Sequence, residues 1–181
     1  MRVAVYAGSF DPITLGHMDI ITKAADDFDT VNVVVMRNPN KKATRSAEFR
    51  ADLIEKSISN LYYAGKNVFA IYSYFDDNCL TANVAYKLSA NVLIRGVKGV
   101  TNLEEEMQLA FNNQLLNDKI HTVWYPVNQE HWHVSSSAVR EILRCTDWLY
   151  QDTNKYLEEK LKHYLPHEII ETVIKNRQLF C

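Results

Sequence analysis

Short apolar blocks, rich in β-branched and aromatic residues, recur along the chain and are separated by longer segments of mixed character. The blocks hardly alternate between apolar and polar positions, which is typical of strands buried on both faces of a sheet. They cover residues 2–7, 31–36, 68–72, 92–94 and 122–125. The sequence therefore predicts five short strands, of which the first two are expected to be buried and the fourth is stopped by Arg95-Gly96.

The segments between these blocks carry apolar residues at helical spacing. In the first of them, Met18, Ile21, Ala25 and Phe28 recur every three or four residues, and the pattern starts near Leu15. The same pattern, or a capping residue in front of it, predicts helices at residues 15–28, 46–61, 80–88, 101–116, 138–144 and 153–164, and a last one with Pro166 in its first turn.

Strands that alternate with helices at this spacing build a parallel sheet with helices on both faces. We therefore expect an α/β protein with a doubly wound parallel five-stranded sheet, a single domain over residues 1–181, and extra C-terminal helices in residues 145–181. Ligands of such sheets bind beyond the carboxyl ends of the strands. The segments that follow strands are the candidates for chemistry, and they are residues 8–12, 38–42, 95–99 and 131–137.

The composition of the chain argues against several classes of function. The formal net charge of its 181 residues is −2, whereas a polybasic nucleic-acid binder would carry a large positive excess. No apolar run approaches the ~18–20 residues of a membrane span, and the first residues lack the apolar core of a signal peptide. Cys79, Cys145 and Cys181 are far apart in the sequence, which fits reduced thiols better than disulfides. We expect a cytoplasmic protein with no nucleic-acid or membrane partner.

The segment after the first strand combines a turn with the start of a helix. Residues 8–17 read GSFDPITLGH. Unpaired N–H groups at a helix N-terminus attract phosphate, although this segment is neither a lysine-bearing nucleotide loop nor a G-x-G-x-x-G turn. His17 is placed to donate a hydrogen bond to a phosphoryl oxygen. It is equally placed to cap its own helix or to pack under the sheet, and the sequence leaves these alternatives open.

The next two segments supply positive charge. Lys41 and Lys42 lie in the loop after the second strand, and a lysine pair there is either solvated surface or part of an anion site. Arg95 and Lys98 follow the fourth strand, where an arginine can hold a phosphate through two parallel hydrogen bonds. The alternative for Arg95 is an ion pair with one of the glutamates at 104–106. Only their position at strand ends favours a ligand-binding role for these cations.

The segment after the fifth strand holds two histidines and three serines. The hydroxyls of Ser135, Ser136 and Ser137, together with N–H groups of the helix that follows, can form a second anion site. A helix cap would account for one serine and leave the other two without a role. No Ser-His-Asp triad is implied, since no orienting acid can be identified. His131 and His133 could suggest a metal pair, but a structural metal site needs about four ligands, so we predict no metal site formed by the protein.

Four stretches of the sequence resemble those of a known family. Residues 8–17 match the signature G-[ST]-F-D-P-x-T-x-G-H of the nucleotidylyltransferase superfamily. Further stretches are similar in order and spacing to those of the pantetheine-phosphate adenylyltransferase family: residues 38–42, Arg95-Gly96 followed by residues 106–110, and residues 135–137. The resemblance extends to about residue 144 and implies a Rossmann-like nucleotidylyltransferase fold.

The resemblance implies that the chain transfers the adenylyl group of ATP to 4′-phosphopantetheine, with Mg²⁺ accompanying ATP. The products would be dephospho-coenzyme A and pyrophosphate, formed by in-line attack without a covalent enzyme intermediate. His17, Lys41 and Arg95 would be catalytic, because they would stabilise charge on the transferred phosphoryl group and hold the phosphate of the acceptor. ATP would contact Ser9, Phe10, His17, Gly96, Val97, Lys98, Glu106, His131, Trp132, His133, Val134, Ser135, Ser136 and Ser137. The acceptor would contact Ser9, Lys41, Thr81 and Arg95.

Two other functions stay open at this point. Another transferase of the superfamily, acting on nicotinate mononucleotide or on a phosphorylated alcohol, would share the first motif and a serine-rich stretch. A nucleotide or coenzyme A sensor would keep the pocket and lose the chemistry, and Lys98, which stands where the family usually has arginine, favours this reading. The presence of His17, Lys41 and Arg95 favours an enzyme, since a sensor could lose these groups.

The family assembles as hexamers, so the resemblance also implies a homo-oligomer. The C-terminal segment is longer here than in the family, and residues 153–164 are predicted to form an added helix. Its apolar residues are Tyr156, Leu157, Leu161 and Tyr164, at helical spacing. This helix could pack on a neighbouring subunit or on the sheet of its own chain.

Overall fold

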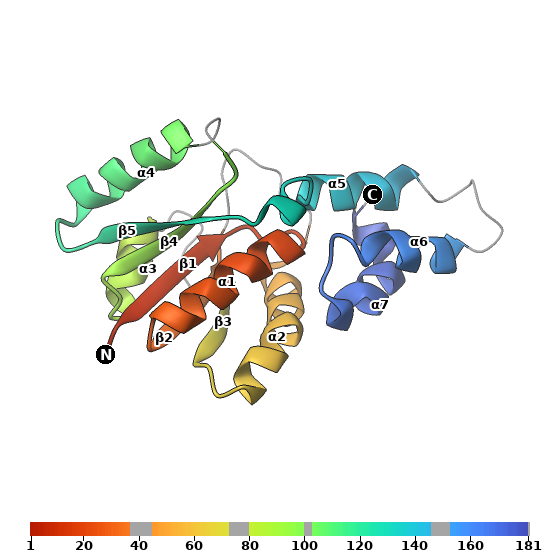
Figure 1. Cartoon of the computed structure of the whole chain (residues 1–181), viewed down its shortest axis with the longest axis horizontal. Helices are drawn as coiled ribbons and strands as arrows, with labels where there is room; N and C mark the ends of the chain where they lie inside the picture. Colours follow the sequence, from red (N-terminus) through yellow and green to blue (C-terminus); the bar gives the residue numbers. More distant parts are fainter. Residues whose placement is uncertain (37–44, 73–79, 100–102, 146–152, 181) are drawn as a thin grey trace.

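Five parallel strands form one sheet in the order β3-β2-β1-β4-β5 (Figure 1). The structure is a computed structural model, and it describes residues 1–36, 45–72, 80–99, 103–145 and 153–180. The strands are β1 (Val3–Gly8), β2 (Thr30–Val35), β3 (Val68–Tyr72), β4 (Val92–Val97) and β5 (His121–Pro126). The five predicted strands and the α/β fold class are confirmed, but β5 lies at the edge of the sheet and its residues are exposed or half-buried.

The fourth strand is longer than the sequence pattern predicts. Arg95 and Gly96 both pair with residues of β5, and the strand ends only at Val97. The prediction was wrong here because a charged residue and a glycine break the apolar block without breaking the ladder. Their backbone N–H and C=O groups still pair with the neighbouring strand. The extension places Arg95 within the sheet, at its carboxyl end.

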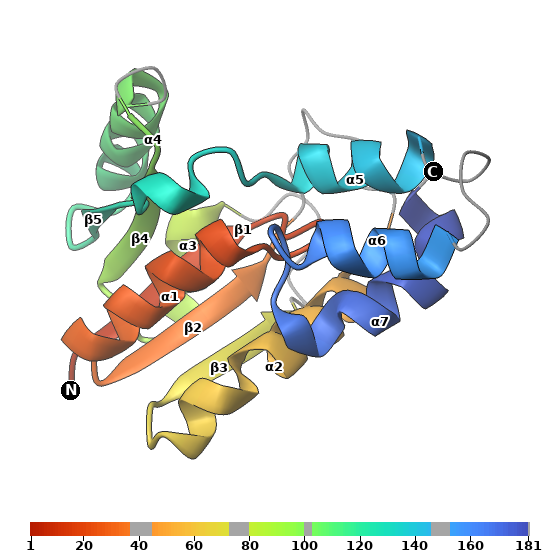
Figure 2. The same ribbon diagram turned by 45° about the vertical axis from the view of Figure 1, so that its right-hand side comes forward.

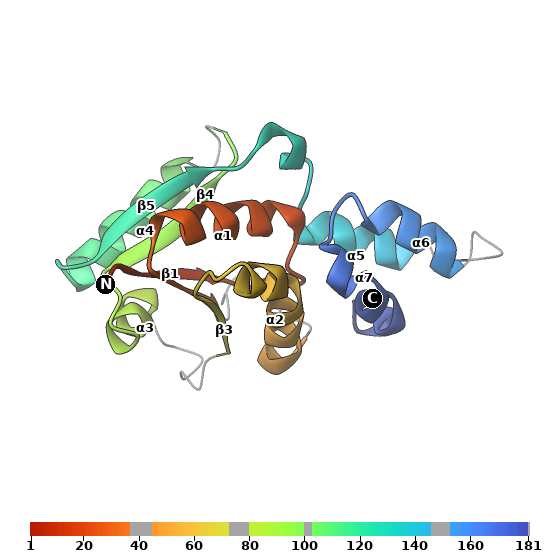
Figure 3. The ribbon, with the colours of Figure 1, turned by 60° about the horizontal axis from the view of Figure 1, so that its bottom comes forward.

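Helices cover both faces of the sheet, as Figures 2 and 3 show. α1 (Leu15–Asp27) and α2 (Ala47–Tyr63) lie on one face, where they connect β1, β2 and β3. α3 (Thr81–Lys87) and α4 (Leu103–Leu116) lie on the other face. The direction of winding therefore reverses between β1 and β4. In doubly wound sheets, this reversal point is where ligands bind.

The central strand β1 shows how the buried core is divided. Val3, Val5 and Ala7 pack on the side of α3, whereas Ala4 and Tyr6 pack on the side of α1 and α2. All five side chains are buried. A strand between two helical layers must be apolar at every position, which is why this block of the sequence does not alternate.

The capping residues fix where helices start. The Ser46 hydroxyl accepts a hydrogen bond from the backbone N–H of Phe49 at 3.2 Å, so the predicted cap of α2 is confirmed. Pro166 immediately precedes α7 (His167–Lys175) instead of lying within its first turn. Thr101 and Glu104 have the spacing of a capping box at the start of the helix predicted over residues 101–116, but Thr101 lies outside the described residues.

The C-terminal helices pack together beyond the carboxyl end of the sheet (Figure 1). They are α5 (Ser136–Cys145), α6 (Thr153–Leu161) and α7, which is followed by the 3₁₀ turn η3 (Arg177–Phe180). Leu157 and Leu161 of α6 are fully buried in the same apolar core as α1 and α2. The added helix therefore packs within its own chain, mainly against α7 and α5 instead of directly on the sheet, and its contact with a neighbouring subunit stays a prediction. Within the described ranges, no helix combines the length and apolar character needed to span a membrane.

Candidate active site

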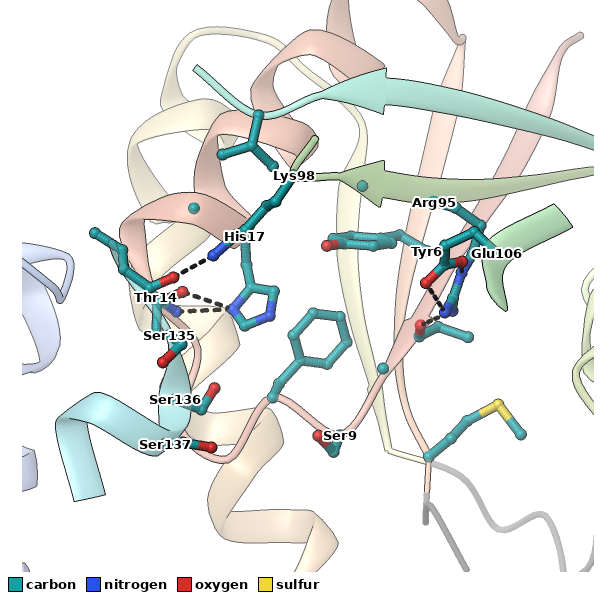
Figure 4. Close-up of a pocket in the computed structure, with 18 of the residues that line it drawn as sticks. Tyr6, Ser9, Thr14, His17, Arg95, Lys98, Glu106, Ser135, Ser136 and Ser137 are labelled. Atoms are coloured by element: carbon teal, nitrogen blue, oxygen red, sulfur yellow. Dashed lines mark hydrogen bonds and ion pairs between the residues drawn. The ribbon is translucent and has the colours of Figure 1, made fainter. Parts of the chain in front are cut away.

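A cavity of about 590 Å³ opens at the carboxyl ends of β1 and β4, where the winding of the sheet reverses (Figure 4). Residues from three of the four predicted segments line it. The predicted site residues in its wall are Ser9, Phe10, His17, Thr81, Arg95, Gly96, Lys98, Glu106, Val134, Ser135, Ser136 and Ser137. The fourth segment, residues 38–42 with Lys41, lies outside the described residues. The topology thus brings together loops that are far apart in the sequence.

The loop between β1 and α1, residues 9–14, is shaped by Phe10. This residue has φ +44°, in the left-handed region that bulky side chains rarely adopt. Its buried ring packs edge-on against Tyr6 and His17, at centroid distances of 5.3 and 5.1 Å. A Cβ on Gly8 would lie 3.0 Å from this ring, closer than ordinary van der Waals contact, so a larger residue at this position would require the ring to shift. Packing around the ring therefore holds an unfavourable backbone conformation beside the cavity.

His17 caps its own helix and lines the cavity at the same time. Its Nδ1 accepts a hydrogen bond from the backbone N–H of Thr14 at 3.1 Å, which satisfies an N–H group at the start of α1. Because Nδ1 acts as an acceptor, a neutral His17 carries its proton on Nε2. The cap therefore fixes both the orientation of the ring and the tautomer that can donate to a ligand oxygen. The sequence left the roles of helix cap and phosphoryl donor as alternatives for His17, and in the structure the two roles are compatible.

Arg95 reaches the cavity from β4 as half of an ion pair. Its Nε and Nη2 donate to the two carboxylate oxygens of Glu106 at 2.5 and 2.9 Å, and its Nη1 donates to the Ala7 carbonyl at 3.3 Å. The ion pair that was the alternative for Arg95 is therefore present. The Arg95 side chain is still 27% exposed, so an anion in the cavity can approach the guanidinium while this pair is intact.

Lys98 and Gly16 lie next to each other at another part of the wall. Lys98 Nζ donates to the Val134 carbonyl, and a Cβ on Gly16 would lie 3.6 Å from this nitrogen. Partial burial lowers the pKa of Lys98. A phosphate in the cavity would favour the charged ammonium and so oppose this shift.

The three serines that follow β5, Ser135, Ser136 and Ser137, all make hydrogen bonds within the protein. Ser135 Oγ accepts from a backbone N–H in the first turn of α5 at 3.1 Å, and is the helix cap. Ser136 donates to the Pro12 carbonyl at 2.7 Å, whereas Ser137 accepts from Arg140 at 3.0 Å. Of the two serines that a cap leaves unexplained, Ser136 therefore connects α5 to the β1–α1 loop, and Ser137 orients an arginine of the same helix that lines the cavity.

Four residues predicted to contact ATP are not part of the cavity wall: Val97, His131, Trp132 and His133. The Trp132 indole N–H donates to the Val127 carbonyl at 3.0 Å, and the side chain is 54% exposed. The His133 ring packs against Tyr164 with 5.4 Å between centroids. His131 ends the short 3₁₀ helix η2 (Gln129–His131). These contacts hold Trp132 and His133 outside the cavity wall, and the contacts of all four residues with ATP stay a prediction.

The wall of the cavity is positively charged between two helix N-termini. Arg95, Lys98 and Arg140 supply three cations, and Glu106 is the one carboxylate among the described lining residues. α1 and α5 both begin at the cavity, and the first N–H groups of a helix carry partial positive charge. Such a site favours a ligand with several negative charges, of which a polyphosphate is the simplest example.

The sequence matches the cytidylyltransferase-like family over residues 5–142. This chain belongs to that family. The phosphopantetheine adenylyltransferase of Clostridium perfringens is 36% identical over 171 residues, which cover 94% of this chain and 92% of that protein. The phosphopantetheine adenylyltransferase of Thermotoga neapolitana is 37% identical, over 88% of this chain and 97% of that protein. The resemblance noted in the sequence is confirmed.

The fold of this cytidylyltransferase-like chain is also found among solved structures. It is similar to Plasmodium falciparum nicotinic acid mononucleotide adenylyltransferase complexed with NaAD, with a TM-score of 0.69 and 18% identity over 98% of this chain and 97% of that chain. At this identity the likeness shows the fold alone. The predicted Rossmann-like nucleotidylyltransferase fold is thereby confirmed.

The motifs shared with the cytidylyltransferase-like family locate the loops of the cavity but not every residue of its wall. Residues that line it without having been predicted are Tyr6, Ala7, Gly8, Thr14, Gly16, Met36, Leu109, Val127 and Arg140. Arg140 follows Ser137 by three positions, and this spacing places two side chains on one face of a helix. Tyr6 precedes Gly8 by two positions and shares its face of β1. Burial raises the pKa of Tyr6, which keeps its hydroxyl protonated as a hydrogen-bond donor.

Proposed function

We propose that this chain transfers the adenylyl group of ATP to the phosphate of 4′-phosphopantetheine, which gives dephospho-coenzyme A and pyrophosphate. The proposal is carried by one cavity in which cations and two helix N-termini surround a volume of about 590 Å³. This volume is in the range of small-molecule sites. Relatives that match along almost their whole length are named phosphopantetheine adenylyltransferases, which supports this choice of acceptor. We expect the reaction in the cytoplasm, because cysteines that lie far apart in the sequence fit reduced thiols better than disulfides.

The reaction forms a bond between the α-phosphorus of ATP and an oxygen of the acceptor phosphate, and it breaks the bond from that phosphorus to the leaving pyrophosphate. An in-line displacement of this kind asks the protein for positioning and charge stabilisation, and not for a nucleophile. We assign His17 to the α-phosphate, since Thr14 orients its ring. Arg95 and Lys41 are assigned to the acceptor phosphate and the transition state.

The remaining cations are assigned to the outer phosphates of ATP. Lys98 and Arg140 line the cavity close to the start of α5. Their charges, with the N–H groups of α5, would stabilise the negative charge that builds up on the departing pyrophosphate. Thr81 and Met36, whose hydroxyl and sulfur lie 3.7 Å apart at the wall, suit the uncharged pantetheine arm.

We propose that Mg²⁺ enters with ATP. Among the residues that the structure describes, no group of three or more His, Cys, Asp or Glu side chains is placed to hold a metal ion. Mg²⁺ in proteins is often bound by substrate phosphates, water and one or two carboxylates. The carboxylate of Glu106 is engaged by Arg95, so the donor set fits an ion carried mainly by the nucleotide. When bound, the ion neutralises phosphate charge. Lys98 and Arg140 of the protein contribute to the same neutralisation.

A panel of acceptors tests this function. The purified chain is incubated with Mg–ATP and with 4′-phosphopantetheine, nicotinate mononucleotide or a phosphorylated alcohol, and pyrophosphate release is followed. We expect 4′-phosphopantetheine to react about 10³-fold faster than the others or more, because a site built around one polar substrate rejects its analogues strongly. Turnover of nicotinate mononucleotide instead would contradict the choice of acceptor. Binding of ATP without pyrophosphate release from any acceptor would identify a sensor.

We also propose that the chain forms a homo-oligomer, a hexamer by family resemblance, and helix α4 supports this. Its one buried residue is Asn113, whereas Phe111, Leu115 and Leu116 are 60, 86 and 56% exposed. The neighbouring strand β5 is an edge of the sheet, and its Trp124 is 40% exposed. Apolar side chains gathered beside an unpaired strand edge are typical of a surface that another protein covers.

Replacing Phe111 and Leu115 together by glutamate should shift the assembly toward the monomer. The charges would have to be desolvated in any contact that buries this face of α4, whereas the exposed positions cost the folded monomer little. Sedimentation velocity at micromolar concentration measures the effect. The matched control replaces Tyr63 of α2 and Leu179 of η3 by glutamate. These residues are 85 and 47% exposed and lie outside α4 and β5. A wild-type chain that sediments as a monomer would contradict the proposal.

A further inference from the structure

Asp11 belongs to the β1–α1 loop, but its carboxylate is used outside the cavity. Ser9 and Phe10 line the cavity, whereas Asp11 does not. Its side chain is 7% exposed and pairs with the guanidinium of Arg45, which is 1% exposed. Arg45 Nη2 donates to Asp11 Oδ2 at 2.5 Å, and its Nε donates to Oδ1. Two parallel hydrogen bonds fix the orientation of both groups as well as their separation.

The same guanidinium also holds the end of the chain. Arg45 Nη1 donates to the carbonyl of Leu179, which lies 134 positions further along the sequence, at 2.9 Å. The central carbon of the guanidinium lies 4.2 Å from the centre of the Phe180 ring. Phe180 is buried, and its ring also meets Phe49 of α2 at 6.2 Å. Arg45 therefore connects the C-terminal turn η3 with the loop beside the cavity.

Two further arginines hold this loop by its backbone. Arg50 donates to the Ser9 carbonyl at 2.5 Å, and Arg140 donates to the Asp11 carbonyl at 2.6 Å. Burial lowers the pKa of Arg50 and of Arg140, and the nearby Asp11 carboxylate opposes the shift in both. The Asp11 carboxylate therefore lies close enough to act on three arginines, and Arg45 binds it through two hydrogen bonds.

The conformation of the loop explains why it needs these contacts. Phe10 has φ +44°, and a non-glycine residue stays in this region only when its surroundings hold it there. The residues on either side of Phe10 are Ser9 and Asp11, and both are anchored by arginines. A displacement of the loop would move the side chains that face the reactants, and a shift of about 1 Å at such a site can cost about 10²-fold in rate.

We propose that Arg45 is a positioning residue: it ties the C-terminal turn to the β1–α1 loop and thereby holds Ser9, Phe10 and His17 in place for the transfer. The kinetic part of this inference rests on the proposed function. Stability alone is a weak reason for the Arg45–Asp11 pair, because buried ion pairs are often no more stabilising than apolar residues of similar volume. A fixed geometry beside the reacting groups is the stronger reason.

The double variant Arg45→Met with Asp11→Asn tests the kinetic part. It removes both charges of the pair together, so that neither partner stays buried as a lone ion, while Arg50 and Arg140 keep their hydrogen bonds to the Ser9 and Asp11 carbonyls. We expect kcat to fall by about 10–100-fold, while the KM for ATP changes less than about threefold, because the cations that face the phosphates remain. The control is Lys56→Met, which removes an exposed ion pair with Asp52 on α2 and should leave kcat unchanged.

Phe180→Ala tests the connection to the C-terminal turn, since it keeps the ion pair and removes the ring beside the guanidinium. We expect amide hydrogen exchange in residues 9–14 to become about 3–30-fold faster, which corresponds to the strength of a cation–π contact, and kcat to fall. The control is Arg177→Gln in the same turn, where the side chain donates to Asn154 at 2.8 Å. A merely structural Phe180 would lower the melting temperature and leave loop exchange and kcat unchanged.

Wild-type kcat in the double variant, or wild-type loop exchange in Phe180→Ala, would overturn the inference. The exchange measurement also separates it from the proposed function. If the wild-type chain transfers nothing to 4′-phosphopantetheine, the proposed function fails, while faster exchange of residues 9–14 in both variants still supports the positioning role of Arg45. Unchanged exchange would refute that role whatever the activity.

Discussion

Replacing His17 by alanine should lower kcat by about 10²–10³-fold while the affinity for ATP stays nearly unchanged. The hydrogen bond from Thr14 to Nδ1 leaves the imidazole proton on Nε2, in a ring that lines the cavity. A donor that is oriented in advance acts mainly on charge that develops in the transition state, and much less on the bound substrate. Initial rates at saturating ATP and 4′-phosphopantetheine, with calorimetry of ATP binding, measure the two effects separately.

His17→Gln separates the catalytic role from the helix cap. Alanine also removes the acceptor for the Thr14 N–H, and the loss of a cap costs about 0.5–2 kcal/mol of stability. Glutamine at this third position of a helix can accept the same backbone hydrogen bond, but it does not place an imidazole N–H in the cavity. We expect the glutamine variant to recover the melting temperature and not kcat. If either variant keeps kcat within about threefold of the wild type, His17 is structural and the proposed mechanism is wrong.

The strands could be predicted because a sheet covered on both faces requires continuous apolar blocks, as in β1. The end of β4 could not be predicted in this way. Arg95 and Gly96 break the apolar block, but their backbone groups pair with β5, and ladder pairing does not depend on the polarity of a side chain. A pattern of hydrophobicity therefore ends a strand too early where the strand enters a polar cavity.

The place of the cavity follows from the strand order, but contacts within it depend on long-range packing. Three glutamates follow one another at 104–106, and only the structure selects Glu106 as the partner of Arg95. His133 follows a strand end as the other site segments do, but its ring packs against Tyr164 of the C-terminal segment. Arg45 showed no pattern in the sequence, because its partners are brought to it from both ends of the chain.

Arg95→Lys should lower kcat/KM for 4′-phosphopantetheine by about 10–100-fold. The guanidinium of Arg95 engages both oxygens of Glu106 with two nitrogens and the Ala7 carbonyl with the third. A lysine keeps the positive charge but offers one compact ammonium in place of a planar fork. Glu106 and an incoming phosphate would then compete for the same group. Steady-state kinetics with the acceptor varied at saturating Mg–ATP would show the effect, and a kcat/KM within about threefold of the wild type would contradict the role of the fork.

Glu106→Gln is the matched variant, because it keeps the shape of the partner and removes the competing charge. A glutamine carbonyl still accepts one hydrogen bond from Arg95, and the Ala7 carbonyl at 3.3 Å still orients the guanidinium. The positive charge of Arg95 is then no longer neutralised before the substrate binds, so we expect the KM for 4′-phosphopantetheine to fall by about 2–5-fold, a typical effect of one partly screened charge. A rise in this KM would lower kcat/KM, as expected for Arg95→Lys. It would mean that Glu106 acts by holding the guanidinium in place. The opposite signs expected for the two variants therefore distinguish a competing carboxylate from a supporting one.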